Sequence, residues 1–334
     1  MKKLTIKTIA EKAGVSVATV SKVINNSGNI SDRTKNRILS IIQEYHFVPQ
    51  QRKQKGNSLG VIMFPFENSA FPSNYDSMVF GGICREAFAQ GFDVTVISGE
   101  KIAAMSPYEL HCYFLSNSLS GAILLGYTAT EEFRNIILKS EIPLISVGKV
   151  PGINSVFSKS GEATAAMIEY MICLGHRKIA YLGLTTDRVP GHLDRFNAYQ
   201  KVLAKNKIPL NKEYIFNLPD AEHLTILNAL QLMLARHDPP DALFFETELF
   251  FKVIIMLQGL GVKVPQDLSV AGFYCSDEPI CEMLPSAVIQ PDVELGRSAV
   301  RNLISRLDTN SNDLRIMLDC QIIYGETIAK IVKI

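Results

Sequence analysis

Two short helical patterns joined by a glycine turn open the chain and constrain its fold more than any other feature. Apolar side chains recur at helical spacing in both patterns, at Ile6, Ile9, Ala10 and Ala13 in the first and at Val20, Val23 and Ile24 in the second. Gly14 ends the first helix, because glycine tolerates the positive φ of a helix terminus. Thr5 and Ser16 are the predicted N-cap residues of the two helices.

A third helix is predicted after Ser31, with an inner face of Ile38, Leu39, Ile41, Ile42 and Tyr45. Two helices joined by a three- to four-residue turn that contains glycine form a helix-turn-helix. The second helix would lie in the major groove with its N-terminal residues at the base edges. A generic three-helix bundle is the alternative, but the polar face of the second helix argues against it.

The charge of the chain is unevenly divided. Residues 1–58 hold eleven Lys and Arg against three Asp and Glu, a net charge of +8, whereas the remainder carries −7. A basic head on a mildly acidic body indicates a nucleic-acid partner for the head. A merely soluble, charged tail would have the same composition, so charge alone does not decide between the two.

The head resembles the DNA-binding domain of the lactose-repressor (LacI/GalR) family. The resemblance rests on AGVSxxTVSxVIN, then SxxTxxRI, then YxFVP, within residues 5–49. It implies that Val17, Ala18 and Lys22 read bases, and Lys22 stands where many members have Arg. The residues predicted to contact DNA are Thr5, Ser16, Val17, Ala18, Thr19, Ser21, Lys22, Asn25, Arg52 and Lys53.

The hinge after the head departs from that family. Residues 49–58 are about five residues shorter than the usual segment and lack the leucine that wedges into the minor groove. Arg52, Lys53 and Lys55 remain available for phosphate or minor-groove contacts. A flexible basic linker is the alternative. The hinge therefore predicts weaker DNA bending than is usual for the family.

From Leu59 onward the pattern is that of an α/β protein. Short apolar runs such as LGVIMF, DVTVIS, GAILLG and LSVAGF alternate with helical stretches such as EEFRNIILKS. This alternation is typical of parallel sheets with right-handed crossovers. A body of this length favours two doubly wound lobes that bind ligands at the carboxyl ends of their strands.

The family resemblance extends over the body, where GHRKIAYLG, VPQDLSVAGF and IQPDVELGRSAVRNL match family motifs. It implies a helix-turn-helix domain followed by a sensor domain that is similar to periplasmic sugar-binding proteins. The expected divisions are a head at 1–48, a hinge at 49–58 and a sensor at 59–334. Within the sensor, the first lobe is expected at 59–157 with 289–318, and the second at 158–288 with 319–334.

The resemblance also implies effector contacts in the cleft between the lobes. Arg195 matches the arginine that usually binds the effector, and Gln290 matches a residue at a lobe crossover. An amphipathic surface helix for Arg195, a structural role for Gln290 and core packing for the aromatics are the alternatives. The predicted effector set is Phe71, Tyr75, Arg195, Thr247, Glu248, Tyr274 and Gln290.

Three departures from the family weaken the case for an ordinary hexose as effector. The family commonly has GFD where this chain has Gly272-Phe273-Tyr274, so Tyr274 replaces an Asp. Thr247-Glu248 replaces an Asn-Asp pair, and Ser158 replaces another Asp. Carboxylates at such positions accept hydrogen bonds from sugar hydroxyls. Glu246 and Glu248 could restore the lost charge. We therefore expect an atypical effector, or regulation through a protein partner with no effector.

The expected function is transcriptional regulation, with repression as the family default. The expected partners are an operator in double-stranded DNA, a second copy of the chain and a small, carbohydrate-like effector. We expect no membrane span, no metal, no cofactor and no catalytic residue. The six cysteines are scattered without metal-ligand spacing, which is typical of a cytoplasmic protein. An enzyme on the α/β body is the remote alternative, because no nucleotide-binding or zinc-protease motif occurs.

Overall fold

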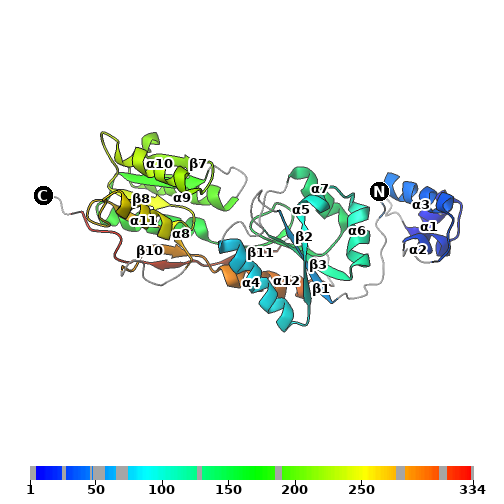
Figure 1. Ribbon diagram of the computed structural model, residues 1–334. Helices are drawn as coiled ribbons and strands as arrows, with labels where there is room; N and C mark the ends of the chain where they lie inside the picture. The colour runs from blue at the N-terminus through cyan, green and yellow to red at the C-terminus, as the bar shows by residue number, and fades with distance from the viewer. Residues whose placement is uncertain are drawn as a thin grey trace.

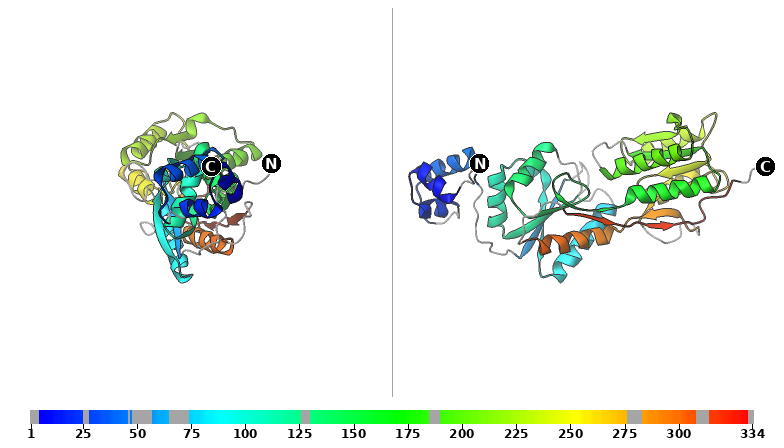
Figure 2. Two further views of the ribbon diagram at one scale, coloured as in Figure 1. Left: turned by 90° about the vertical axis from the view of Figure 1, so that its right-hand side faces the viewer. Right: turned by 180° about the vertical axis from the view of Figure 1, so that it is seen from behind.

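The computed structural model describes residues 5–24, 28–45, 47, 57–64, 74–125, 130–184, 190–275, 283–307 and 314–331. Figure 1 shows three bodies in line: a small helical head, a first α/β lobe in the middle and a second α/β lobe at the far end. The views in Figure 2 agree, because the head and both lobes overlap when the molecule is seen end-on.

The head is the predicted three-helix unit, with α1 (Ile6–Ala13), α2 (Val17–Ile24) and α3 (Asp32–Glu44). Thr5 caps α1 by accepting a hydrogen bond from the Thr8 amide at 3.4 Å, and Gly14 ends it with a left-handed φ of 61°. Ala10, at 3% exposure, packs with α2 and α3 in one apolar cluster. Tyr108 of α6 joins that cluster, so the head lies against the first lobe.

The first lobe is built on a six-stranded parallel sheet. In spatial order its strands are β11 (Arg315–Leu318), β5 (Asn154–Ser158), β4 (Leu144–Val147), β3 (Leu119–Leu125), β1 (Ser58–Met63) and β2 (Asp93–Ser98). One face is covered by α4 (Asn74–Ala89) and α12 (Asp292–Ser305). The other is covered by α5 (Gly99–Ala103), α6 (Pro107–Ser116) and α7 (Glu131–Ser140).

The second lobe repeats the plan with one antiparallel edge. Its strands run β12 (Gln321–Ile323), β10 (Ser286–Ile289), β9 (Ser269–Tyr274), β8 (Ala242–Phe245), β6 (Ile179–Leu184) and β7 (Ile215–Leu218). Only β12 is antiparallel to its neighbour among these pairs. The helices α8 (Ser160–Cys173) and α9 (Pro190–Lys205) pack on one face. On the other lie α10 (His223–Leu234), α11 (Phe250–Gly259) and the short η1 (Lys212–Tyr214).

The chain passes between the lobes three times, after β5, after β10 and after β11. The predicted architecture of a helix-turn-helix domain and two doubly wound lobes is confirmed. The residue numbers proposed for the domain and lobe limits stay predictions. The sequence analysis did not name β5, β7, β10 or β11 as strands; each has only four or five residues.

Two glycines let α4 and α12 cross in close contact within the first lobe. A Cβ at Gly82 would lie 2.1 Å from the Val293 carbonyl oxygen, and one at Gly296 would lie 2.1 Å from that of Val79. No other residue fits at either position without separating the helices. The crossing fixes Asp292, the first residue of α12, relative to Tyr75 near the start of α4.

Candidate functional sites: a DNA-reading face and an inter-lobe polar cluster

The N-terminal end of α2 presents the predicted base-reading residues to solvent. Val17, Ala18 and Lys22 are exposed, and Val17 keeps 40% of its surface although it is apolar. The opposite face of α2 is buried, with Val20 at 0% and Val23 at 6% exposure. An exposed valine at a helix N-terminus contributes little buried surface to the stability of the head. Its position suits contact with a thymine methyl group.

The short polar side chains around α2 organise its first turn. Ser16 Oγ accepts a hydrogen bond from the Thr19 amide at 3.1 Å and lies 2.9 Å from Thr19 Oγ1. Ser16 and Thr5 are exposed, and Thr19 and Ser21 are half-buried. Free amides at a helix N-terminus and hydroxyls beside them suit phosphate oxygens.

Lys22 is held in place by a glycine outside the helix. Gly28 has a φ of +79°, and a Cβ there would lie 3.3 Å from Lys22 Cδ. The aliphatic stem of Lys22 therefore lies close to Gly28. The other residues predicted to contact DNA, Asn25, Arg52 and Lys53, lie outside the described residues, as do Lys55 and most of the hinge.

Arg195 of α9 lies at the centre of a buried polar cluster in the second lobe. It is 8% exposed, and its guanidinium lies 3.9 Å from the centroid of the Phe273 ring. Its Nη1 donates to the backbone carbonyl of Glu246, and its Nη2 donates to Gln290 Oε1 at 3.0 Å. A surface position, the alternative reading of this arginine, is wrong because the side chain is buried.

Glu246 follows β8 and compensates the charge of Arg195. Its Oε1 accepts hydrogen bonds from the Leu184 amide at 2.8 Å and pairs with His192 Nδ1 at 2.6 Å, while its Oε2 lies 3.7 Å from Arg195 Nη1. Gly183 admits this carboxylate, since a Cβ there would lie 2.7 Å from Glu246 Cγ. A carboxylate at 1% exposure needs such partners to remain charged.

Several contacts join this cluster to the first lobe. Gln290 Oε1 also accepts a hydrogen bond from Ser158 Oγ at 2.7 Å, at the end of β5. Lys149, after β4, forms an ion pair with Asp194 of α9. The predicted residues Arg195 and Gln290 thus lie together at the lobe boundary, and Gln290 contacts both lobes.

Two carboxyl groups face each other across the same boundary. Glu248, after β8 of the second lobe, and Asp292, at the start of α12 on the first, are hydrogen-bonded partners. Burial and the neighbouring charge of Glu248 raise the pKa of Asp292 to about 9, and burial raises the pKa of Glu248. Two like charges so close in a buried site cannot both ionise readily, so the pair holds a proton.

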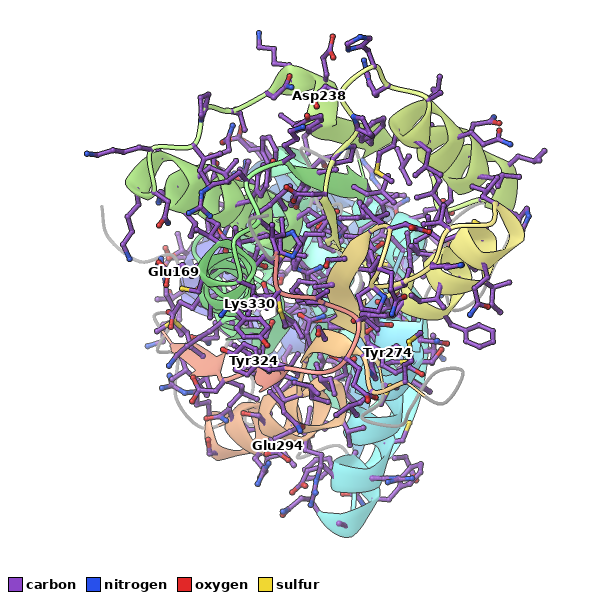
Figure 3. The ribbon with its side chains drawn as sticks, turned by 90° about the vertical axis from the view of Figure 1, so that its left-hand side faces the viewer. Glu169, Asp238, Tyr274, Glu294, Tyr324 and Lys330 are labelled. Carbon is purple, nitrogen blue, oxygen red and sulfur yellow. The ribbon has the colours of Figure 1, made fainter. Side chains whose placement is uncertain are left out.

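Tyr75 and Tyr274, two predicted aromatics, lie at this boundary as well. The Tyr75 amide donates a hydrogen bond to the Glu248 carboxylate, and burial raises the pKa of the Tyr75 hydroxyl above its usual value. Tyr274 ends β9 and packs 5.7 Å from the Phe250 ring. In Figure 3 it lies beside α4, in agreement with Asn74 Nδ2 of α4 lying 3.9 Å from Cys275 Sγ. Phe71 lies outside the described residues.

The sequence analysis missed four members of the inter-lobe cluster. Asp292 and His192 were not named, nor was the Lys149–Asp194 pair. Asp292 stands in the first turn of an amphipathic helix, where an acidic residue is common because it complements the helix dipole. The apolar residues that follow it gave no signal that it faces Glu248 of the other lobe.

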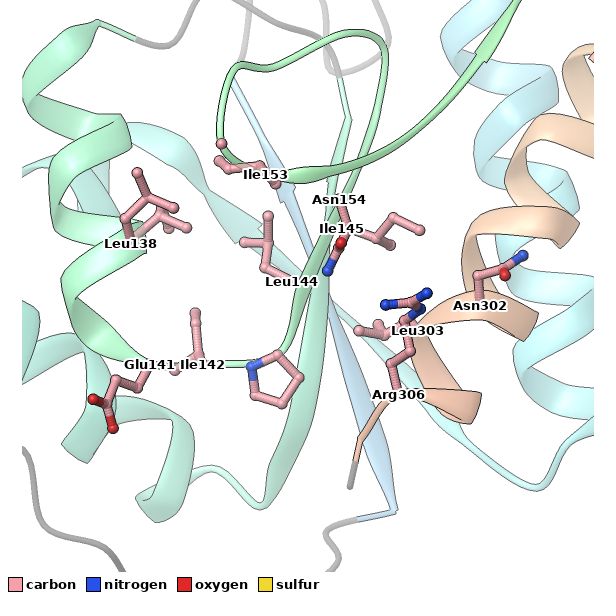
Figure 4. A pocket seen from close by; sticks show the side chains of 13 residues that line it. Leu138, Glu141, Ile142, Leu144, Ile145, Ile153, Asn154, Asn302, Leu303 and Arg306 are labelled. Carbon is pink, nitrogen blue, oxygen red and sulfur yellow. The ribbon is translucent and has the colours of Figure 1, made fainter. Parts of the chain in front are cut away.

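A separate cavity of about 260 Å³ lies inside the first lobe. Figure 4 shows it between α7, β4 and the end of α12, lined by apolar side chains such as Leu138, Ile153 and Leu303, with Asn302 and Arg306 at one side. None of the predicted effector residues lines it. Among the described residues no cluster of His, Cys, Asp or Glu is arranged to hold a metal ion.

Comparison with known proteins agrees with the two kinds of domain. Residues 5–50 match the family described as bacterial regulatory proteins, lacI family, and residues 168–328 match the periplasmic binding protein-like domain. Catabolite control protein A of Priestia megaterium is 24% identical over 328 residues, which cover 94% of this chain and 96% of that protein.

Two solved structures share the fold over nearly the whole chain. The transcriptional regulator CelR in complex with cellobiose has a TM-score of 0.70 and 21% identity, covering 97% of this chain and 99% of that one. The Lac repressor dimer bound to operator and the anti-inducer ONPF has a TM-score of 0.69 and 19% identity, covering 98% and 100%.

A helix-turn-helix with an exposed reading end, attached to a two-lobed periplasmic-binding-protein-like body, defines a class of DNA-binding transcriptional regulators. The head is a helix-turn-helix of the lacI family of bacterial regulatory proteins, and the body matches the periplasmic binding protein-like domain, which confirms the resemblance found in the sequence. In the part of the chain that the structure describes, no helix is both long and apolar enough to cross a bilayer.

Proposed function

We propose that this regulator is a cytoplasmic repressor that binds a two-fold symmetric operator as a homodimer and has no catalytic activity. The exposed N-terminal end of α2 carries the proposal, because Val17, Ala18 and Lys22 are free to enter the major groove. One such head reads only a half-site, so a palindromic operator needs two copies of the chain. The Lac repressor, which shares the fold, is a dimer in its operator complex.

The residues proposed to contact DNA divide into two groups. Val17 and Ala18 contact thymine methyl groups, and Lys22 makes a single-point contact with guanine, since an ammonium lacks the two-pronged geometry of arginine. Thr5, Ser16, Thr19, Ser21 and Asn25 contact phosphates, and Arg52 and Lys53 contact phosphates or the minor groove. The shortened hinge bends the operator less than a hinge with a wedged leucine.

We further propose that a small effector binds between the lobes and changes the affinity for DNA. Arg195, Gln290, Thr247, Glu248, Tyr75, Tyr274 and Phe71 form the proposed site. The Gln290–Ser158 and Lys149–Asp194 contacts link the lobes there. The two lobes can adopt more than one relative arrangement, and a ligand that replaces or strengthens such contacts favours one of them. The change in lobe arrangement shifts the spacing of the two heads in the dimer.

Sedimentation velocity and fluorescence anisotropy with one selected operator test this proposal together. The expected result is a dimer that binds the full palindrome far more tightly than a single half-site at equal salt concentration. A monomer that binds one half-site with full affinity would contradict the dimeric arrangement. Hydrolytic or transfer activity of the isolated body would contradict the non-catalytic role.

A further inference from the structure

Two carboxyl groups, Glu248 and Asp292, lie close together at the boundary between the lobes. Asp292 is 2% exposed and lies in the field of Glu248. Arg195 is the cation that acts on Glu248 and Asp292, but it is already paired with Glu246. The Glu248–Asp292 pair therefore has no cation of its own among the described residues.

Three oxygen atoms of the carboxyl pair and of the neighbouring Thr247 are buried without a hydrogen-bond partner, namely Asp292 Oδ1, Glu248 Oε2 and Thr247 Oγ1. In the adjoining Arg195–Glu246 pair, Glu246 Oε2 and Arg195 Nε make no hydrogen bond either. Leaving a buried acceptor without a hydrogen bond destabilises the fold, so such atoms are rare in folded proteins. Arg195 does not donate to these oxygens, because Nη1 and Nη2 are committed to Glu246 and Gln290 and its buried Nε makes no hydrogen bond.

We propose that the effector of this regulator carries a protonated amine, and that its ammonium group binds between Glu248 of the second lobe and Asp292 of the first. The inference rests on the proposed function, in which an effector binds between the lobes. An ammonium group has three N–H donors and no acceptor. Its donors match the three unpartnered oxygens in number and in kind.

The ammonium takes the place of a proton. Without ligand, the Asp292–Glu248 pair keeps a proton because burial and mutual repulsion disfavour two charges. When the ammonium binds, both carboxyls ionise and the shared proton leaves to solvent, so one positive charge replaces another. A neutral polyhydroxy ligand supplies donors but no charge, and it therefore releases no proton.

The groups that surround the pair come from every element packed against it. They are Tyr75 and Asp76 of α4, Arg195 of α9, Thr247 after β8, Cys275 after β9 and Cys320 before β12. Burial raises the pKa of Cys320 to about 11 and raises that of the Cys275 thiol, and the Tyr75 hydroxyl is likewise held neutral.

Isothermal titration calorimetry on the full chain tests the proposal with matched probes. The pairs are D-glucosamine and D-glucose, putrescine and 1,4-butanediol, and ethanolamine and ethylene glycol. We expect at least one amine to bind at least about 30-fold more tightly than its hydroxy partner, as expected for a buried charge pair. The amine's affinity should rise with pH by up to about tenfold per unit, since one proton is released. Titrations in buffers of different ionisation enthalpy should report that proton.

Asp292→Asn and Glu248→Gln each keep the shape of the side chain and remove one carboxylate. Each variant should lose the amine preference and the proton release. Glu294→Gln is the matched control, because Glu294 lies on the same helix, pairs with Arg301 and takes no part in the pair. Using both site variants keeps the test valid if one of them fails to fold.

Three results would overturn the inference: no amine binding by the wild-type chain, equal binding of amine and hydroxy partner, or an amine preference that survives in both site variants. A neutral ligand that alters operator affinity would contradict the proposal that the effector carries an ammonium group, but it would leave the proposed function intact. A protein that binds no operator would contradict the proposed function, and the amine titrations would still report on the carboxyl pair.

Discussion

The DNA-reading face and the inter-lobe cluster use polar side chains in opposite ways. On α2 the side chains of Val17, Ala18 and Lys22 face solvent, and the helix below them is held by an apolar core. Between the lobes Arg195, Glu246 and Asp292 are buried; Arg195 pairs with Glu246, and Asp292 pairs with Glu248. The first surface is free to meet a large partner, whereas the second must exchange internal contacts before a ligand can bind.

This difference predicts separate consequences for substitutions. A change on the reading face should alter affinity for DNA with little effect on folding. A change in the inter-lobe cluster should alter the stability of the body first and ligand response with it. Four experiments can break or sharpen this contrast.

Glu246→Ala should have the largest effect on stability. It leaves Arg195 buried without its carboxylate and frees His192 and the Leu184 amide. Breaking a buried pair from one side costs about 3–5 kcal/mol, to be measured by urea unfolding of the body. The neutral isostere Glu246→Gln should lose less, because its amide oxygen can still accept a hydrogen bond. Equal, small losses for both variants would show that this cluster is solvated.

Lys22→Ala should weaken binding to the selected operator by about 1–3 kcal/mol and relax the choice of base beneath it. Anisotropy with single-base operator variants measures both effects. Lys7→Ala, an equal loss of charge at an exposed position of α1, is the matched control and should weaken all sequences alike. If the two variants lose the same base preference, Lys22 reads no base.

The pH dependence of the body should follow Asp292. Its pKa is raised in the folded state, so the folded protein holds a proton that the unfolded chain releases above about pH 4. Stability should therefore fall as pH rises from about 5 toward 9, by up to about 1.4 kcal/mol per pH unit. Thermal unfolding of Asp292→Asn should lack this slope. An unchanged slope would place the titrating group elsewhere.

Thr5→Ala should have the smallest of the four effects. It removes the side chain that caps α1 and should cost about 0.5–1 kcal/mol in the stability of the head. Hydrogen exchange of the α1 amides measures this locally. Thr5→Ser, which keeps the capping oxygen, is the control. A loss of operator affinity larger than the loss of stability would point to a phosphate contact by the hydroxyl.

The sequence predicted the reading face in detail because its determinants are local. Thr5, Gly14 and Ser16 define the helix ends, and apolar spacing separates the buried from the exposed side of α2. The strands with long apolar runs, such as β1 and β3, were equally visible. By contrast, β11 is a four-residue strand at a sheet edge, Arg315 to Leu318, in which exposed and half-buried side chains alternate. So short a run gives little indication of a strand in the sequence.

The inter-lobe cluster could be predicted only in part. Arg195, Glu248 and Gln290 were found through family motifs, and the loss of the usual carboxylates was visible. Asp292 was missed because it meets Glu248 only after the chain has crossed between the lobes, and His192 because it meets Glu246 only 54 residues further along the second lobe. Contacts over such sequence distances depend on the packing of α4 against α12, which no local pattern specifies.

Selection of bound DNA from a random pool by the purified, ligand-free protein tests the central claim most directly. The account predicts a palindrome whose two half-sites lie about one helical turn, roughly 10 base pairs, apart. It also predicts A/T pairs under Val17 and Ala18. A single, asymmetric half-site, or only G·C pairs at those positions, would contradict the account of two α2 helices reading the major groove.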